Sequence, residues 1–175
     1  MLTNKFKINY SIGAVANGIK TDTFTFFLLF FYSNIIGLNP GLAGLAIFIA
    51  LCVDAVTDPL MGTISDRTNS KYGRRHPFMM ISFIPMSIGY ILLFAPRQDW
   101  DMTQNDLFLW MTLFTILTRI GMTLFDIPHR AFGGEVTKNY EERTLLMSWR
   151  EMMGWVAGLS NAFLGYGIFF ASTPE

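Results

Sequence analysis

The chain has 175 residues, of which 51% are hydrophobic and only 15% are charged, with 13 acidic and 13 basic side chains. An ordinary soluble domain carries about 25% charged residues, so the composition favours a membrane protein over a soluble helical domain. The absence of a net charge argues against a nucleic-acid partner. A single cysteine, Cys52, excludes disulfides within the chain and argues against thiolate metal sites.

Five apolar segments are each long enough to supply the roughly 20 residues that a membrane-spanning helix needs. We expect these spans at about residues 10–36, 41–64, 77–95, 106–128 and 145–170. Asn39 is the expected N-cap of the second span, and Pro40 occupies its first helical position. The sequence therefore predicts an all-α membrane protein with about five transmembrane helices.

The connections between these spans alternate in charge, and the basic residues gather in every second one. They gather at the N-terminus, between spans two and three, and between spans four and five, as Lys5, Lys7, Arg67, Lys71, Arg74, Arg75, Lys138 and Arg143. The positive-inside rule then places the N-terminus in the cytoplasm. We expect a multi-pass protein of the plasma or inner cell membrane.

Two carboxylates lie inside the second span. Asp54 and Asp58 are four residues apart, so they share one face of a helix. Acids at membrane depth are costly and repel each other, which makes such a pair a candidate functional site. The pair indicates cation-coupled transport.

The other spans also carry polar groups. Span one contains Asn17, Lys20 and Asp22; span four contains Arg119, Thr123 and Asp126; span five contains Arg150 and Glu151 near its cytoplasmic end. These groups must face one another or a water-filled cavity. Structural ion pairs between helices are the alternative explanation, and for Lys20, Asp22 and Arg119 it stands equally well.

The residue types fit a hard cation. Carboxylate and hydroxyl oxygens bind such ions, so Asp54, Asp58 and Asp126 are candidate ligands for Na⁺. Thr57 and Thr123 are candidates for neutral oxygen ligands, although each hydroxyl can instead bond to its own helix backbone. We expect no other cofactor.

The connection after the second span is rich in charge and glycine. It contains Gly62, Asp66, Arg67, Gly73, Arg74 and Arg75. A solvated, positively charged cytoplasmic loop would have the same composition, so composition alone assigns this segment no function.

Two segments together resemble one transporter family. The first segment reads Asp54-x-x-x-Asp58-Pro59-x-x-Gly62-x-x-x-Asp66-Arg67-Thr68, followed by Gly73-Arg74-Arg75-x-Pro77. The second segment contains Asp126-Ile127-Pro128, Glu135, Glu142-Arg143-Thr144 and Arg150. This pattern resembles the glycoside–pentoside–hexuronide:cation symporters, the melibiose-permease-like branch of the major facilitator superfamily. The resemblance implies that the chain is an N-terminal fragment with most of the first six-helix half, and that a C-terminal half is missing.

The resemblance also implies roles for individual residues. The cation would bind Asp54, Asp58 and Asp126, with Thr57 and Thr123 at adjoining positions. Asp126 and Arg150 would contact substrate, with Asn17, Lys20 and Asp22 as further candidates in span one. Gly62, Asp66, Arg67, Gly73, Arg74 and Arg75 would form a gating loop. Gly18 stands where the sugar permeases have a sugar-binding acid, and Arg130 replaces an aromatic residue, so both positions argue against a melibiose-like galactoside.

The function implied is cation-coupled symport, with Na⁺ or H⁺, of a sugar or related small solute by alternating access. A lipid or amphiphile carrier of the same superfamily and a non-transporting membrane scaffold subunit are the alternatives. The sequence offers no nucleophile–base pair or metal cluster of an enzyme.

Overall fold

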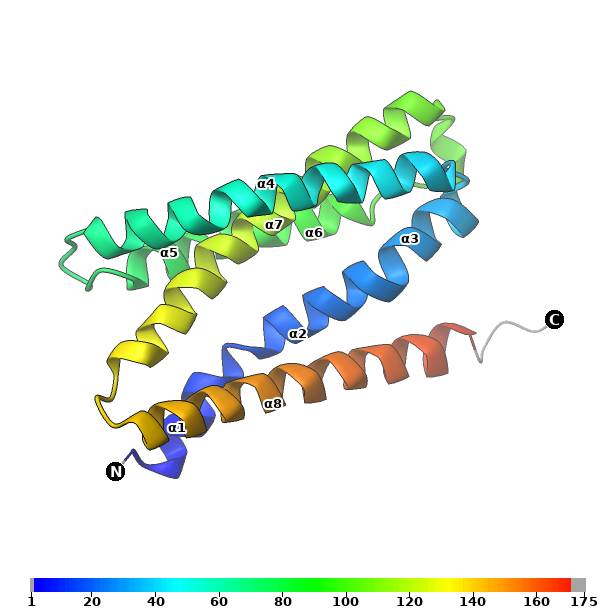
Figure 1. The fold of residues 1–175 in the computed structure, drawn as a ribbon. Helices are drawn as coiled ribbons and strands as arrows, with labels where there is room; N and C mark the ends of the chain where they lie inside the picture. Colours follow the sequence, from blue (N-terminus) through cyan, green and yellow to red (C-terminus); the bar gives the residue numbers. More distant parts are fainter. Residues whose placement is uncertain (1, 171–175) are drawn as a thin grey trace. The chain divides into compact units, whose positions relative to one another are not determined.

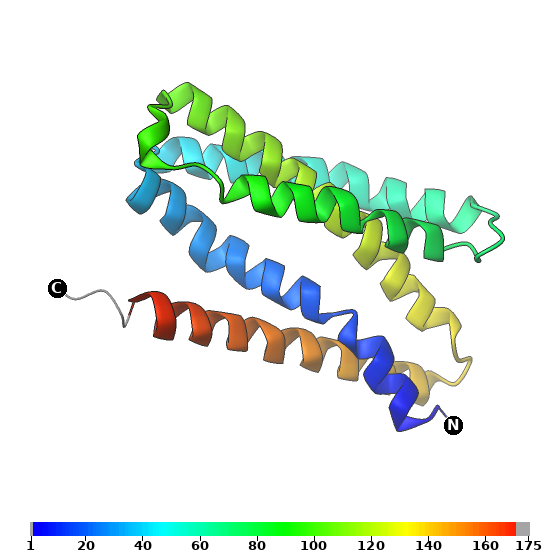
Figure 2. The ribbon, with the colours of Figure 1, turned by 180° about the vertical axis from the view of Figure 1, so that it is seen from behind.

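The computed structural model describes residues 2–170, and every regular element in that range is a helix. The chain divides into two units, one comprising residues up to 28 together with those from 132 onward, and the other comprising Leu29–Ala131. Figures 1 and 2 show the helices of each unit from opposite sides.

The first unit is built on two long helical stretches that lie side by side. The N-terminal stretch comprises α1 (Asn4–Ile12), α2 (Val15–Asp22) and the π-helix η1 (Thr23–Phe27), and the C-terminal stretch comprises α8 (Tyr140–Leu164) and the π-helix η4 (Gly165–Phe170). The stretches run parallel, because contacts pair Gly18 with Gly154 and, one turn later, Asp22 with Gly158. This parallel direction is the one expected for first and fifth spans that cross a bilayer alternately.

The predicted first span, about 10–36, is not one continuous α-helix. It is interrupted around Gly13, continues through the short helix α3 (Leu28–Phe30), and ends in the π-helix η2 (Phe31–Ile36). The hydroxyls of Thr21, Thr23 and Thr25 each donate to the carbonyl four residues earlier, at 2.7–2.8 Å. Such back-bonds compete with regular helix hydrogen bonds and commonly bend a helix.

The second unit contains the remaining spans. Besides η2 and most of α3, its elements are α4 (Pro40–Arg67), α5 (His76–Ile81), α6 (Phe83–Leu93), the short 3₁₀-helix η3 (Gln98–Trp100) and most of α7 (Gln104–Glu135). Asn39 caps α4 as predicted, since its side chain accepts the Gly41 N–H at 2.8 Å. Gly37 before it has φ +88°, a left-handed conformation that glycine adopts without strain.

Three helical stretches among the described residues are long and apolar enough to cross a membrane: Pro40–Arg67, His76–Leu93 and Gln104–Glu135. They match predicted spans two, three and four, although α7 extends well beyond the expected end at 128. The segments predicted as spans one and five are also helical, but they do not meet these limits of length and hydropathy. A membrane protein can keep such polar helices when their polar groups face protein or a water-filled cavity.

Small residues set the spacing of helices in the second unit. A Cβ on Gly89 of α6 would lie 2.5 Å from Thr118 Oγ1 of α7, and one on Gly121 would lie 2.6 Å from the backbone nitrogen of Met86. Helices in lipid pack closely where small residues let their backbones approach. The C-terminal carbonyls of α6 are also satisfied by side chains, because Tyr32 donates to Leu93 at 2.7 Å and Trp110 donates to Leu92 at 2.8 Å.

Candidate functional site

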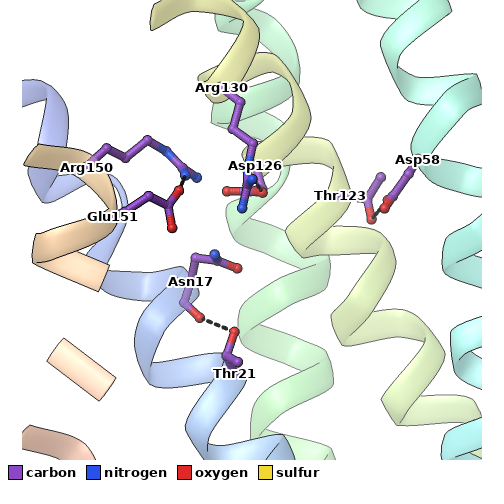
Figure 3. A network of polar contacts seen from close by, with 8 residues as sticks. All are labelled: Asn17, Thr21, Asp58, Thr123, Asp126, Arg130, Arg150 and Glu151. Carbon is purple, nitrogen blue, oxygen red and sulfur yellow. Dashed lines mark hydrogen bonds and ion pairs between the residues drawn. The ribbon is translucent and has the colours of Figure 1, made fainter. Parts of the chain in front are cut away.

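The predicted acid pair of α4 faces α7. Asp54 Oδ2 accepts a hydrogen bond from Arg119 Nη1, and Asp58 Oδ1 accepts one from the Thr123 hydroxyl at 2.7 Å (Figure 3 shows the second contact). Both pairs are 65 residues apart in sequence, as are Gly62 and Ile127, which also lie next to each other. The two helices therefore run parallel, and each four-residue step brings another pair of residues together.

The two carboxylate oxygens of Asp54 differ in their hydrogen bonding. Oδ2 forms the ion pair with Arg119, whereas Oδ1 is buried and has no hydrogen-bond partner among the described residues. A buried polar atom without a partner carries a desolvation cost, so its presence calls for an explanation. A coupling cation would supply the missing interaction.

The predicted neutral ligands behave differently from each other. The Thr123 hydroxyl contacts Asp58 on the neighbouring helix, so it lies at the acid pair. The Thr57 hydroxyl instead makes a long contact, at 3.5 Å, to the backbone oxygen of Asp54 on its own helix. This is the backbone alternative anticipated for a threonine within a helix.

Asp126 pairs with a residue of its own helix. Its Oδ2 accepts a hydrogen bond from Arg130 Nε at 2.7 Å, one turn away. The described residues hold no group of three His, Cys, Asp or Glu side chains placed to bind a metal ion. Asp54 and Asp58 thus lie together against α7, and a joint role of these two acids with Asp126 stays a prediction.

The predicted substrate residues of the first unit line a cavity of about 120 Å³ between α2 and α8. Its lining comprises Ala14, Asn17, Gly18, Thr21, Asp22, Arg150, Glu151, Gly154 and Trp155. Arg150 is 1% exposed, and its Nη1 lies 2.6 Å from Oε1 of Glu151. Asn17, Asp22 and Arg150 therefore share a cavity, whereas Lys20 does not line it, and their binding of substrate stays a prediction.

The packing around Gly18 explains why span one has no acid at this position. A Cβ at this position would lie 2.0 Å from the backbone oxygen of Gly154, so the backbones of α2 and α8 nearly touch there. No larger residue fits without separating the helices. The sugar-binding acid of the sugar permeases therefore has no room at this position.

The predicted gating loop contains an ion pair. Arg75 is nearly buried, and its Nη2 lies 2.9 Å from Oδ1 of Asp66, near the C-terminal end of α4. Gly73 has φ +91°, a left-handed conformation that glycine adopts without strain. Gly62 faces Ile127 of α7, where an added Cβ would make an ordinary contact at 3.8 Å.

Two residues of these sites were absent from the predicted site set. Arg119 was interpreted only as a polar group of span four, and Glu151 only as one of span five. A parallel register of spans two and four would have pointed to Arg119, because Asp54–Arg119 and Asp58–Thr123 have the same separation in sequence. That register, however, cannot be read from one sequence.

A family model described as MFS/sugar transport protein matches residues 9–174. The chain belongs to this family. The match confirms the resemblance to the glycoside–pentoside–hexuronide:cation symporters, and with it an all-α membrane protein of a transporter family rather than an enzyme family.

Curated relatives agree with the assignment of the chain to this family. The inner membrane symporter YicJ of Escherichia coli (strain K12) is 31% identical over 94% of this chain and 35% of its own length. The putative glycoside/cation symporter YagG of the same organism is 33% identical over 91% of this chain and 34% of its own. The sodium-dependent lysophosphatidylcholine symporter 1-A of Danio rerio is 30% identical over 99% of this chain and 32% of its own. The chain spans about a third of the length of these relatives.

Proposed function

We propose that the complete carrier is a secondary symporter that couples the movement of a monovalent cation, Na⁺ or H⁺, to that of a sugar or related solute by alternating access. The proposal rests chiefly on Asp54, whose Oδ1 is buried without a hydrogen-bond partner among the described residues. Its neighbour Asp58 lies one turn away on the same face of a helix apolar enough to span a bilayer. Carboxylates at that depth are retained when they bind an ion or a proton.

The charges at this site favour a monovalent ion. Asp54 and Asp58 contribute two negative charges, and Arg119 contributes one positive charge directly bonded to Asp54. One negative charge therefore remains to be neutralised, which a sodium ion or a proton does completely. A divalent ion would leave an excess positive charge in the low-dielectric interior, which is costly. The relatives named as cation symporters support the same class of coupling.

In this scheme the cation binds at the Asp54–Asp58 face, and the solute binds in the cavity that contains Arg150. The resemblance gives Asp126 a part in both cation and solute binding, and the Asp66–Arg75 pair would hold one of the two access states. Cation and solute would bind the same conformer, so each would raise the affinity of the other by the same factor, typically about 5–150-fold. We also place the N-terminus in the cytoplasm, on the distribution of basic residues.

An amphiphile carrier is the second candidate. Two observations favour it: one relative is named as a lysophosphatidylcholine symporter, and the contact of Gly18 with Gly154 leaves no room for an acid at position 18. A scaffold without transport activity has less support, because it gives no reason to retain a buried carboxylate oxygen without a partner.

The test is solute binding by the purified complete carrier, first against Na⁺ concentration at fixed pH and then against pH without Na⁺. We expect one of the two ions to raise solute affinity at least fivefold, and Asp58→Asn to abolish that effect. Asp99→Asn, in the exposed loop before α7, is the matched control and leaves the coupling intact. If neither ion changes the affinity of any methyl glycoside or lysophospholipid tested, coupled symport is wrong.

A further inference from the structure

The cavity between α2 and α8 carries more negative than positive charge. Its charged lining residues are Asp22, Arg150 and Glu151, so two carboxylates accompany one guanidinium. All three come from the two helices that enclose the cavity. A solute entering here meets a net negative environment, although the cavity contains the arginine expected to bind substrate.

The arginine is already engaged with one of the acids. Arg150 is buried, and its Nη1 lies 2.6 Å from Oε1 of Glu151 (Figure 3). Glu151 itself remains 55% exposed, so it is accessible as a hydrogen-bond acceptor from the cavity side. An ionised carboxylate only accepts hydrogen bonds, and therefore suits hydroxyl donors and repels anions.

We propose that Glu151 sets the specificity of this cavity for an uncharged, hydroxyl-bearing solute and against a sugar acid. The inference rests on the proposed symport function and adds the charge class of its substrate. A uronate would need Arg150 as its counter-ion and would have to displace Glu151 from it. A neutral glycoside needs no such exchange, because its hydroxyls donate to Glu151 and Asp22 while its oxygens accept from Arg150 and Asn17.

The other residues that line the cavity are compatible with binding of an uncharged sugar ring. Gly18 and Gly154, which line the cavity in close contact, add no side chain to it, and the carboxylate of Asp22 lies against Gly158. Trp155 adds an indole surface that an uncharged ring can cover. A volume of about 120 Å³ corresponds to roughly four water molecules at liquid density, so this cavity holds the hydroxyl-bearing edge of a ring.

The experiment compares matched solutes on the complete carrier in proteoliposomes. The probes are methyl glycosides of glucose and galactose, each paired with the uronate of the same ring, with the coupling cation present. We expect each neutral member to bind at least about tenfold more tightly than its uronate, as a full charge at short range implies. Glu151→Gln removes the negative charge beside Arg150 and narrows the affinity ratio about tenfold or more, and Glu151→Asp restores the ratio.

Glu141→Gln is the control, because it removes one negative charge from an exposed position in the first turn of the same helix. It should leave the ratio unchanged. Uronates binding as tightly as the neutral glycosides, or a ratio unaffected by Glu151→Gln, would overturn the inference while leaving symport intact. If no glycoside or uronate binds with the cation present, sugar symport itself is wrong, and the inference is wrong with it.

Discussion

Arg119 of α7 is bonded to Asp54 of α4, so one acid of the predicted cation site already holds a positively charged partner. Both side chains are largely buried, with exposed fractions of 11% and 20%. The pair reduces the repulsion between Asp54 and Asp58 and leaves a single negative charge on the two acids. In the proposed symport mechanism, Arg119 would be a fixed internal cation beside the exchangeable one.

Replacing Arg119 tests this relationship. Arg119→Gln removes the positive charge and leaves two acids together, so we expect tighter binding of the coupling cation, by about tenfold, because more negative charge attracts it. Arg119→Gln should also lower the free energy of unfolding by about 3–5 kcal/mol, since Asp54 loses its buried partner. Cation-dependent protein fluorescence and thermal unfolding of the complete carrier measure the two effects.

Arg97→Gln, in the exposed loop after α6, controls for the loss of an arginine as such. Cation affinity unchanged by Arg119→Gln would mean that Arg119 has only a structural role.

The contact between Thr123 and Asp58 leads to a second prediction. Thr123→Ala deletes the hydroxyl that donates to Asp58 Oδ1 at 2.7 Å, which should cost about 1–3 kcal/mol and weaken cation binding. Thr123→Ser keeps the hydroxyl and should preserve both properties. The measurement is the solute affinity of each variant as the cation concentration is raised. If Thr123→Ala and Thr123→Ser respond equally to the cation, the hydroxyl is not needed.

The contact of Gly18 with Gly154 makes a third prediction. Gly18→Ala places a methyl group 2.0 Å from a backbone oxygen, so the helices must separate, at a cost of about 1–3 kcal/mol. Gly44→Ala is the matched control, because an added Cβ meets nothing within 4 Å there. The unfolding temperature in detergent should fall for Gly18→Ala and should stay the same or rise for Gly44→Ala. An unchanged unfolding temperature for Gly18→Ala would show that α2 and α8 do not pack as described.

The Asp66–Arg75 pair makes a fourth prediction. If this contact holds one access state, Asp66→Asn should shift the inward-facing and outward-facing populations, while the double exchange Asp66→Arg with Arg75→Asp should restore part of the balance. Distances between spin labels on the complete carrier report these populations. Populations that stay the same in Asp66→Asn would remove the loop from the gating mechanism.

The sequence by itself determined the class of protein and most of its helices. Apolar segments of bilayer length locate α4, α6 and α7 because the hydrocarbon core tolerates only helices with internally satisfied backbones. Asn39 and Pro40 marked the start of α4 because capping depends on adjacent residues alone. The acid pair was likewise visible, since an i, i+4 spacing fixes the shared face of a helix. The family followed from motifs contained within single segments.

Only the tertiary structure decided which side chains meet between helices. A sequence gives the face of each helix but not the register of two helices, so the pairing of Asp54 with Arg119 and of Asp58 with Thr123 could not be derived from it. The same holds for Gly18, whose role depends on how closely the backbone of α8 approaches. The first span also differs from the single helix predicted: it breaks around Gly13 and is π-helical over Thr23–Phe27, where threonine hydroxyls bond back to their own helix. Packing distance, which no single segment encodes, determines these contacts.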